Sequence, residues 1–237
     1  MNFIPITYKN TNLNISLYKG NTTTESIPFN KIFKTVVEER SKIEKEIIKN
    51  PLFKYSLEPL KPDNDSPEII KNMCYASNLA NVGPMASVAG AIAEILCEKC
   101  IGLGFDAGFI ENGGDIALFG DRNFKIQIYT KNSPFSDKFF IPLNPAKLFQ
   151  DKILGICTSS SSIGPSVSFG DSDATTIIAN SPAIADAFAT SLGNLVKNDE
   201  KCLEDVIEFG KKFNVVKGIC IIVKDKIGMW NVRLEKF

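Results

Sequence analysis

The chain has 237 residues, 44% of them hydrophobic, with a mean hydropathy of +0.00. It is long enough to bury one large core, or two small cores that share an interface. Lys and Arg total 27 and so do Asp and Glu, so no net field draws the protein onto nucleic acid or an anionic membrane. The absence of histidine excludes Ser-His-Asp and Cys-His nucleophile systems, histidine metal ligands and a histidine proton shuttle. From the balanced charge we expect no nucleic-acid or membrane partner.

The cysteines and the apolar segments indicate a compartment. Cysteine occurs at positions 74, 97, 100, 157, 202 and 220. No charged segment followed by an apolar one opens the chain as in a secretory signal, so we expect a cytoplasmic protein with reduced thiols. No apolar run approaches the roughly 18 to 20 residues needed to cross a bilayer, which predicts that the chain has no membrane span.

The first part of the chain shows one strand pattern followed by helical patterns. Apolar and polar residues alternate at Leu13–Tyr18, which predicts a strand. Apolar residues recur at helical spacing among Lys and Glu over Phe29–Lys49, which predicts an amphipathic helix. Two further helices are expected at 66–80 and 83–100, because each begins with a proline at the first helical position.

Strand patterns predominate in the second part of the chain. They lie at 109–111, 115–118, 124–129, 138–141, 153–157 and 175–179. Helices are predicted over Ser181–Leu195, again with proline at the first position, and over Glu200–Phe213. The segments 218–223 and 228–233 predict a closing hairpin. Because strands and helices occur in runs and do not alternate strictly, the predicted fold class is α+β with a mainly antiparallel sheet and packed helices.

The segment ADAFAT places Asp186 and Thr190 on one face of an alanine-rich helix, four residues apart. A carboxylate on an apolar helix loses hydration, so it needs a cation, a metal or hydrogen-bond donors. Carboxylate and hydroxyl oxygens suit Mg²⁺, which makes these residues the candidate metal ligands. The alternative is a buried aspartate bonded to neighbouring backbone donors.

The segment ENGGDIAL contains Asn112, Gly113, Gly114 and Asp115. The glycines permit positive φ angles and leave the backbone accessible, and Asp115 could accept hydrogen bonds from a ring, ribose or hydroxyl of a ligand. The alternative is a β-hairpin turn, since Asn-Gly is foremost a turn signal.

The serine-rich loop after Cys157 contains Ser159, Ser160 and Ser161. Its hydroxyl and backbone N–H groups could contact an anionic ligand, or the segment could be a plain polar loop. Cys157 could act as a reactive thiolate or carry sulfur, or it could be a buried cysteine at a strand end. The helix start at 83–86 could lie beside a ligand phosphate, although its small residues equally favour close packing.

Four segments in this order, VGPMASVAGAIAE, ENGGDIAL, CTSSSSIGPSVSFGDSDA and ADAFATSLGN, resemble an uncharacterised prokaryotic family related to the ApbE-like FAD:protein FMN transferases. The resemblance extends upstream through Arg40 and covers most of the chain. It implies a single ApbE-like domain over 1–237, made of two intertwined T-fold-like α+β subdomains around a cleft.

The resemblance also implies a ligand and a cation. In the FMN transferases a GGD segment lies near flavin, which here corresponds to Gly113, Gly114 and Asp115, and an ADAxAT-like helix helps bind Mg²⁺, which here corresponds to Asp186 and Thr190. The expected cofactors are therefore Mg²⁺ and FAD or FMN, the expected partner is a nucleotide-like small molecule, and a homodimer is expected. No residue is assigned a catalytic role.

Two departures separate the chain from the transferases. The histidine-containing HxxDPxxG-like segment of the transferases is replaced by a loop over 164–170, in which Pro165 stands where many relatives in the uncharacterised family carry histidine. We also expect no lipoprotein signal. The predicted function is an ApbE-like flavin- or nucleotide-binding protein with Mg-dependent group transfer of the FMN-transferase type. The alternative is a non-catalytic accessory protein of cytoplasmic sulfur assimilation, in sulfide incorporation and homocysteine synthesis, with sulfur-assimilation proteins as partners.

Overall fold

The computed structural model describes residues 3–20, 22–23, 27–131, 133–148, 153–161 and 169–236. The helices are α1 Phe29–Lys49, α2 Leu52–Tyr55, α3 Glu68–Ala80, the 3₁₀ helix η1 Pro84–Ser87, α4 Val88–Gly102, α5 Pro145–Leu148, α6 Pro182–Leu195 and α7 Glu200–Gly210. The strands are β1 Ile4–Tyr8, β2 Thr11–Lys19, β3 Thr22–Thr23, β4 Ala107–Asn112, β5 Asp115–Phe119, β6 Phe124–Gln127, β7 Phe139–Leu143, β8 Leu154–Ser159, β9 Ala174–Ala179, β10 Val216–Val223, β11 Lys226–Trp230 and β12 Glu235–Lys236.

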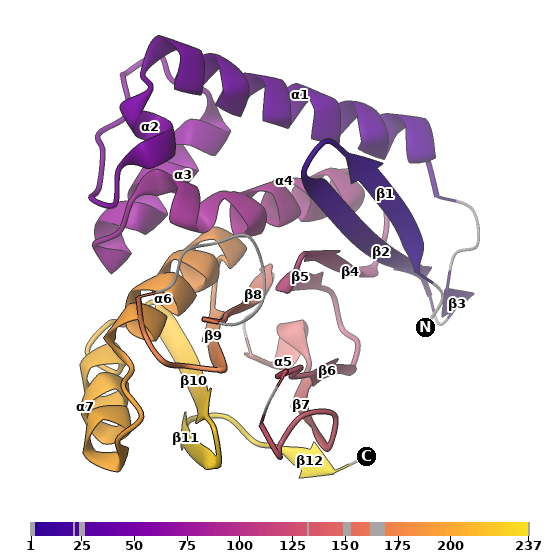
Figure 1. Cartoon of the computed structure of the whole chain (residues 1–237). Helices are drawn as coiled ribbons and strands as arrows, with labels where there is room; N and C mark the ends of the chain where they lie inside the picture. Colours follow the sequence, from indigo (N-terminus) through magenta and orange to yellow (C-terminus); the bar gives the residue numbers. More distant parts are fainter. Residues whose placement is uncertain are drawn as a thin grey trace.

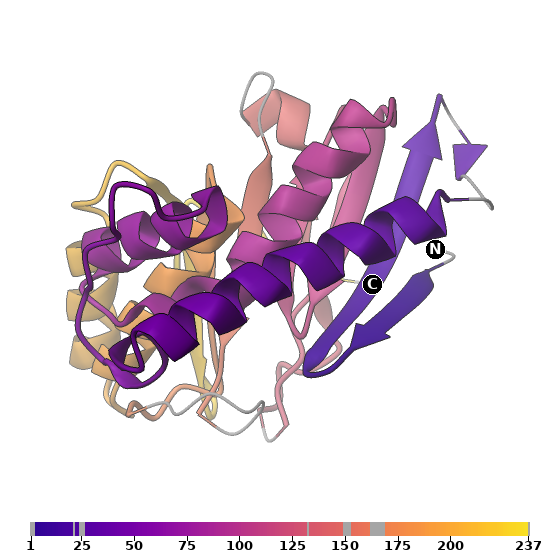
Figure 2. The same cartoon turned by 90° about the horizontal axis from the view of Figure 1, so that it is seen from above.

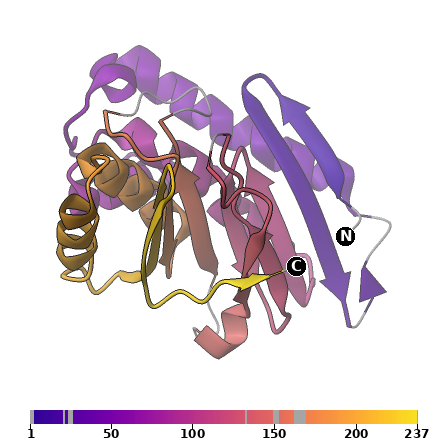
Figure 3. The ribbon, with the colours of Figure 1, turned by 60° about the horizontal axis from the view of Figure 1, so that its bottom comes forward.

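Most strands belong to one large antiparallel sheet in the order β1-β2-β4-β5-β8-β9-β10-β11, with β3 paired to β2. The large helices cover one face of this sheet, and a small sheet in the order β12-β7-β6 covers the other (Figures 1 and 3). Because successive side chains of a strand point to opposite faces, the large sheet contributes to two cores, one under the helices and one under the small sheet. In β10, Ile219 and Ile221 pack toward the helices, whereas Cys220 and Ile222 pack toward the small sheet.

The large sheet consists of two halves with the same order of elements. In the first half, β1 and β2 precede the helices and β4 and β5 follow them; in the second, β8 and β9 precede α6 and α7, and β10 and β11 follow. Pairing of β5 with β8 joins the halves into one continuous sheet. The predicted α+β fold with duplicated T-fold-like halves is therefore confirmed, while the division of the chain into two intertwined subdomains stays a prediction.

The predicted helices and strands mostly lie where expected, and α1 and α6 have the expected bounds. Strand β1 was not predicted because Pro5 lies inside it; proline is tolerated there because β1 is an edge strand. The helix predicted over 83–100 begins instead as the 3₁₀ turn η1. The predicted strand 228–233 ends early, at Trp230, because Asn231 has φ +50°.

Helix α1 lies across α4 and the first half of the sheet (Figure 2). It buries Ile32, Val36 and Ile43, which recur at helical spacing. Among the described residues no single helix is long and apolar enough to cross a membrane; only the bent pair Glu68–Ala80 and Pro84–Gly102, at 102°, meets those criteria together.

Candidate functional site

A cavity of about 420 Å³ lies among α1, the start of α4, the β4–β5 turn, the end of β8 and α6. Its volume is in the range of small-molecule sites, about 300 to 1,000 Å³. The described residues that line it are Asn10, Thr11, Asn12, Arg40, Ile43, Glu44, Ile47, Met85, Ala86, Val88, Ala89, Ile92, Asn112, Gly113, Asp115, Thr158, Ser159, Ser160, Asp186 and Thr190. The structure thus brings together, from four separate segments, most of the residues that the sequence predicted for a site.

Asp186 reaches the cavity from a firmly anchored helix. Ser181 caps α6, with its Oγ accepting from the N–H of Ile184, and Pro182 occupies the first helical position. Glu94 of α4 accepts hydrogen bonds from the Ser181 hydroxyl at 2.6 Å and from the Ala183 N–H at 3.1 Å. Because the start of α6 is held at both points, the position of Asp186 is set by α4 as much as by its own helix.

Asp186 also caps α4. Its Oδ2 accepts a hydrogen bond from the Gly90 N–H at 2.9 Å, and this N–H belongs to the first turn of α4, where backbone donors lack helical acceptors. The predicted alternative, a buried aspartate bonded to backbone donors, is therefore correct for one of its oxygens. The contact also gives the N–H of Gly90 a carboxylate acceptor within the protein.

The close approach of α4 to α6 depends on Gly90. A Cβ at this position would lie 2.2 Å from the Pro182 carbonyl oxygen and 2.9 Å from the Asp186 Cβ. Both distances are far inside van der Waals contact. The small residues of the VGPMASVAGAIAE segment therefore serve packing, as the sequence indicated, while Met85 and Ala86 from the same segment line the cavity.

Asp115 reaches the cavity from a tight hairpin. Gly113 and Gly114 have φ of +67° and +105°, and Asn112 pairs with Asp115 across the turn, so the predicted hairpin alternative is confirmed. The Asn112 side chain donates to the Ala89 carbonyl at 3.2 Å, which fixes the hairpin to α4. Gly113 lines the cavity, whereas Gly114 does not.

The two aspartates influence each other's ionisation. Burial raises the pKa of Asp115 well above its usual range, and the nearby Asp186 carboxylate raises it further. Burial raises the pKa of Asp186 to about 7, and the N–H groups of Gly90 and Ala89 oppose this shift. Asp115 Oδ1 is buried and has no hydrogen-bond partner among the described residues. The cavity therefore has an acidic wall in which negative charge is poorly compensated.

Hydroxyl groups surround this acidic wall. Ser159 and Ser160 line the cavity at the end of β8, as does Thr158, which was not predicted. Thr158 Oγ1 lies 2.9 Å from Thr176 Oγ1 in the neighbouring strand. Ser161 lies outside the lining, and its hydroxyl donates to the Ser172 carbonyl at 2.8 Å.

The residues present fit a hard divalent cation. Asp115 and Asp186 supply carboxylate oxygens and Thr190 supplies a hydroxyl, which are the ligand types that Mg²⁺ prefers. The orphaned Asp115 Oδ1 is an acceptor that a cation would satisfy. The described part of the chain contains no group of three or more His, Cys, Asp or Glu side chains arranged as a metal site, so water or ligand oxygens would complete the coordination.

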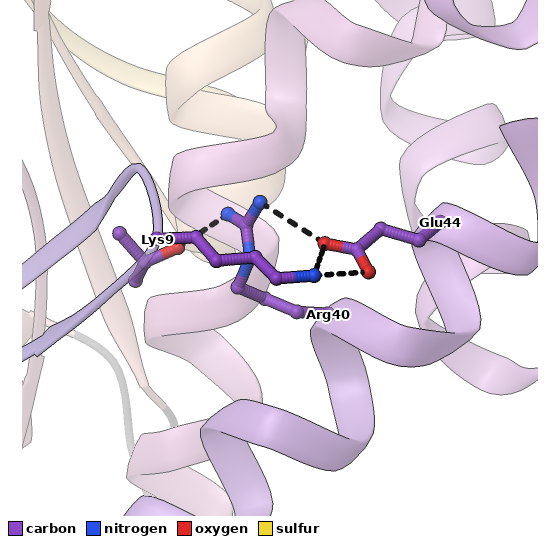
Figure 4. Close-up of polar contacts among 4 residues, drawn as sticks. Lys9, Arg40 and Glu44 are labelled. Atoms are coloured by element: carbon purple, nitrogen blue, oxygen red, sulfur yellow. Dashed lines mark hydrogen bonds and ion pairs between the residues drawn. The ribbon is translucent and has the colours of Figure 1, made fainter.

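The wall formed by α1 was missed from the sequence. Ile43, Ile47 and Arg40 line the cavity from this helix, and Arg40 shares the buried stripe of Val36 and Ile43. A cation on the apolar face of an amphipathic helix was the signal that could have found it. Figure 4 shows the Arg40 guanidinium beside Glu44, whose carboxylate also binds Lys9.

Cys157 is a core residue. It is fully buried, its thiol donates to the Pro182 carbonyl at 3.4 Å, and burial raises its pKa well above the usual range. The alternative of a reactive thiolate at this position therefore finds no support in its surroundings. The predicted loop over 164–170, with Pro165, lies largely outside the described residues.

Comparisons with known proteins identify the family of the chain and the solved structures that share its fold. Residues 3–217 match the family described as AbpE bacteria. The chain is 40% identical over 203 residues to a UPF0280 protein of Methanocaldococcus jannaschii, covering 85% of this chain and 81% of that protein. It is 42% identical over 197 residues to a UPF0280 protein of Archaeoglobus fulgidus, covering 82% and 78%.

The chain belongs to the AbpE bacteria family. The fold of this family member also matches solved structures of ApbE proteins. The Pseudomonas stutzeri flavinyl transferase ApbE gives a TM-score of 0.62 at 11% identity, covering 97% of this chain and 93% of that one. The ApbE protein of Thermotoga maritima gives 0.61 at 12% identity, covering 99% and 97%. The predicted relation to ApbE-like proteins is therefore confirmed for the family and the fold.

Proposed function

We propose that this protein binds a flavin nucleotide in the cavity, together with Mg²⁺, as a flavin transferase of the ApbE type does. The single observation that carries the proposal is the convergence of Asp115, Ser159 and Asp186 from three distant segments on one cavity. The ApbE-like fold supports it.

The two kinds of cavity wall suit the two parts of such a ligand. Ile43, Ile47, Met85, Val88 and Ile92 form an apolar surface against which a flavin ring would lose its hydration favourably. The acidic wall and its hydroxyls supply oxygen ligands and hydrogen-bond partners for the polar end.

The cation would be held by Asp115, Asp186 and Thr190. When bound, Mg²⁺ neutralises a pyrophosphate and stabilises a departing nucleotide. The chain's own residues orient the ligand: the Gly90 N–H fixes the Asp186 carboxylate, and the Asn112 amide fixes the hairpin that carries Asp115.

Calorimetric titration with FAD and Mg²⁺ tests the proposal, using Asp186→Asn as the variant. The asparagine oxygen can still accept from the Gly90 N–H, so the substitution removes charge and retains the cap. We expect saturable binding to the unaltered chain and at least ~10-fold weaker binding to Asp186→Asn, equivalent to about 1.4 kcal/mol. The exposed Asp225, changed to Asn, is the control and should bind normally.

Absence of binding to both FAD and FMN contradicts the proposal, as does equal binding by the Asp186→Asn protein. Transfer itself is followed separately as AMP release with covalent FMN on an acceptor protein. A protein that binds FAD tightly but releases no AMP would retain the binding function and lack the transfer reaction.

The proposed compartment is the cytoplasm. All six cysteines are free and five of them are buried, which fits a reducing environment. The homodimer and the role in sulfur assimilation stay predictions; the buried thiols favour neither.

A further inference from the structure

Arg40 is a cation with unused hydrogen-bonding capacity at the wall of the cavity. A guanidinium carries five N–H donors. Arg40 Nη1 donates to Thr11 Oγ1 at 2.6 Å, and Nη2 lies 3.5 Å from Glu44 Oε1. Arg40 Nε is buried and has no acceptor among the described residues. An unsatisfied buried donor is costly, so an added acceptor would be favourable here.

Glu44 does not fully neutralise Arg40, because the same carboxylate also pairs with Lys9 (Figure 4). Lys9 Nζ lies 2.8 and 2.7 Å from the two oxygens of Glu44, closer than the 3.5 Å that separates Glu44 from Arg40. The Lys9 contact is also the largest cause that lowers the pKa of Glu44. Two cations thus share one carboxylate, and the group keeps a net charge of about +1 at neutral pH.

Arg40 lies where its positive charge can act on a ligand in the cavity. Its side chain is 19% exposed, and Arg40 is the one cationic side chain among the described residues that line the cavity. Since the planar guanidinium can pair two N–H groups with two oxygens of a phosphate and is always charged, an acceptor for it is best supplied by a phosphate group.

We propose that Arg40 selects ligands that carry a phosphate, by binding that phosphate at the α1 wall of the cavity. The inference rests on the proposed flavin nucleotide site and adds the group that distinguishes a flavin nucleotide from riboflavin. Glu44 and Thr11 orient the guanidinium, and Lys9 acts through Glu44.

The test compares FMN with riboflavin, which differ by one phosphate. Flavin fluorescence titrations are made in EDTA, so that no cation links the phosphate to the acidic wall. We expect the unaltered chain to bind FMN at least ~10-fold more tightly than riboflavin. In Arg40→Met, which keeps a long apolar side chain, this ratio should fall to about 2 or less while riboflavin affinity is unchanged.

Arg40→Lys and Arg122→Met complete the comparison. Lysine keeps the charge and loses the planar fork, so Arg40→Lys should retain an intermediate ratio. Arg122 lies outside the cavity, with its guanidinium carbon 3.8 Å from the centre of the Tyr18 ring, and Arg122→Met should keep the full ratio. Thermal unfolding of each variant establishes that it is folded.

An unchanged ratio in folded Arg40→Met overturns the assignment, as does an equal loss of FMN and riboflavin affinity. If neither flavin binds to the unaltered chain, the proposed function is wrong, and ADP against adenosine then tests Arg40 by the same ratio. An unaltered chain that prefers the phosphorylated member of neither pair overturns the inference.

Discussion

The acidic wall and the α1 wall of the cavity are built in different ways. Asp186 is locked between two helices and bonded to the Gly90 backbone, so its position follows from packing. Arg40 is held by side chains, Thr11 and the shared Glu44. A backbone-anchored carboxylate should tolerate little change around it, whereas the side-chain network on α1 should adjust. The acidic wall is therefore a rigid site suited to a cation, and the α1 wall is a more adaptable site suited to an anion.

The largest effect should come from Gly90→Ala, which tests the rigidity of the acidic wall. The new Cβ would lie 2.2 Å from the Pro182 carbonyl oxygen. Relieving this overlap would require the packed helices α4 and α6 to move apart. We expect a loss of at least about 3 kcal/mol in the free energy of unfolding, measured in urea. Gly102, in the same helix, has nothing within 4 Å of its Cβ position, so Gly102→Ala should change stability by less than about 1 kcal/mol. Equal effects would show that the α4–α6 contact is not tight.

Charge on the acidic wall should make metal-free stability depend on pH. Because the pKa of Asp186 rises from 3.8 to about 7 on folding, the folded state binds this proton more tightly, and stability falls as pH rises from about 4 to 7. At about 1.4 kcal/mol per pH unit the fall approaches an upper limit of about 4 kcal/mol. Urea unfolding in EDTA at pH 5 and pH 8 measures the part of this fall between pH 5 and 7, which is at most about 3 kcal/mol.

Asp186→Asn should flatten this pH profile without removing it, since burial also raises the pKa values of Asp115 and Glu94. The same slope in both proteins would mean that Asp186 does not titrate in this range. In the unaltered chain at pH 8, saturating Mg²⁺ should restore part of the lost stability, by about 1 to 3 kcal/mol; no response would argue against a cation at this wall.

A substitution at the α1 wall should have a smaller and indirect effect. In Lys9→Met, Glu44 loses its closest partner and should pair fully with Arg40, so we expect the preference for FMN over riboflavin to fall by a factor of about 2 to 3 in the same titrations. Stability should change by less than about 1 kcal/mol, because Lys9 and Glu44 side chains are 48% and 37% exposed. A preference that stays constant in Lys9→Met would mean that Glu44 does not compete with a ligand for Arg40.

The same contrast explains what could be predicted from the sequence. The two segments that form the acidic wall each carry a short motif. Ser181-Pro182 starts α6 and Gly113-Gly114 forms the hairpin turn, so local rules predicted both segments. The interaction of Asp115 with Asp186 was not predictable, because they are 71 residues apart in sequence and only the sheet brings them together.

The α1 wall was hidden for a different reason. Arg40 lies outside the four motif segments of the resemblance, and its contact with Thr11 depends on how the β1–β2 hairpin lies against α1. Strand β1 was itself missed because Pro5 weakens the strand pattern. The periodic segment of α1 was therefore predicted with its bounds, but its role in the cavity needed the tertiary structure.

A crystal structure of the protein grown with FAD and Mn²⁺ in place of Mg²⁺ tests the central claim most directly. We predict flavin nucleotide density in the cavity between α1 and the acidic wall, and an anomalous manganese peak in contact with Asp186. Flavin bound elsewhere on the surface, or an empty cavity at saturating FAD and Mn²⁺, would contradict the account.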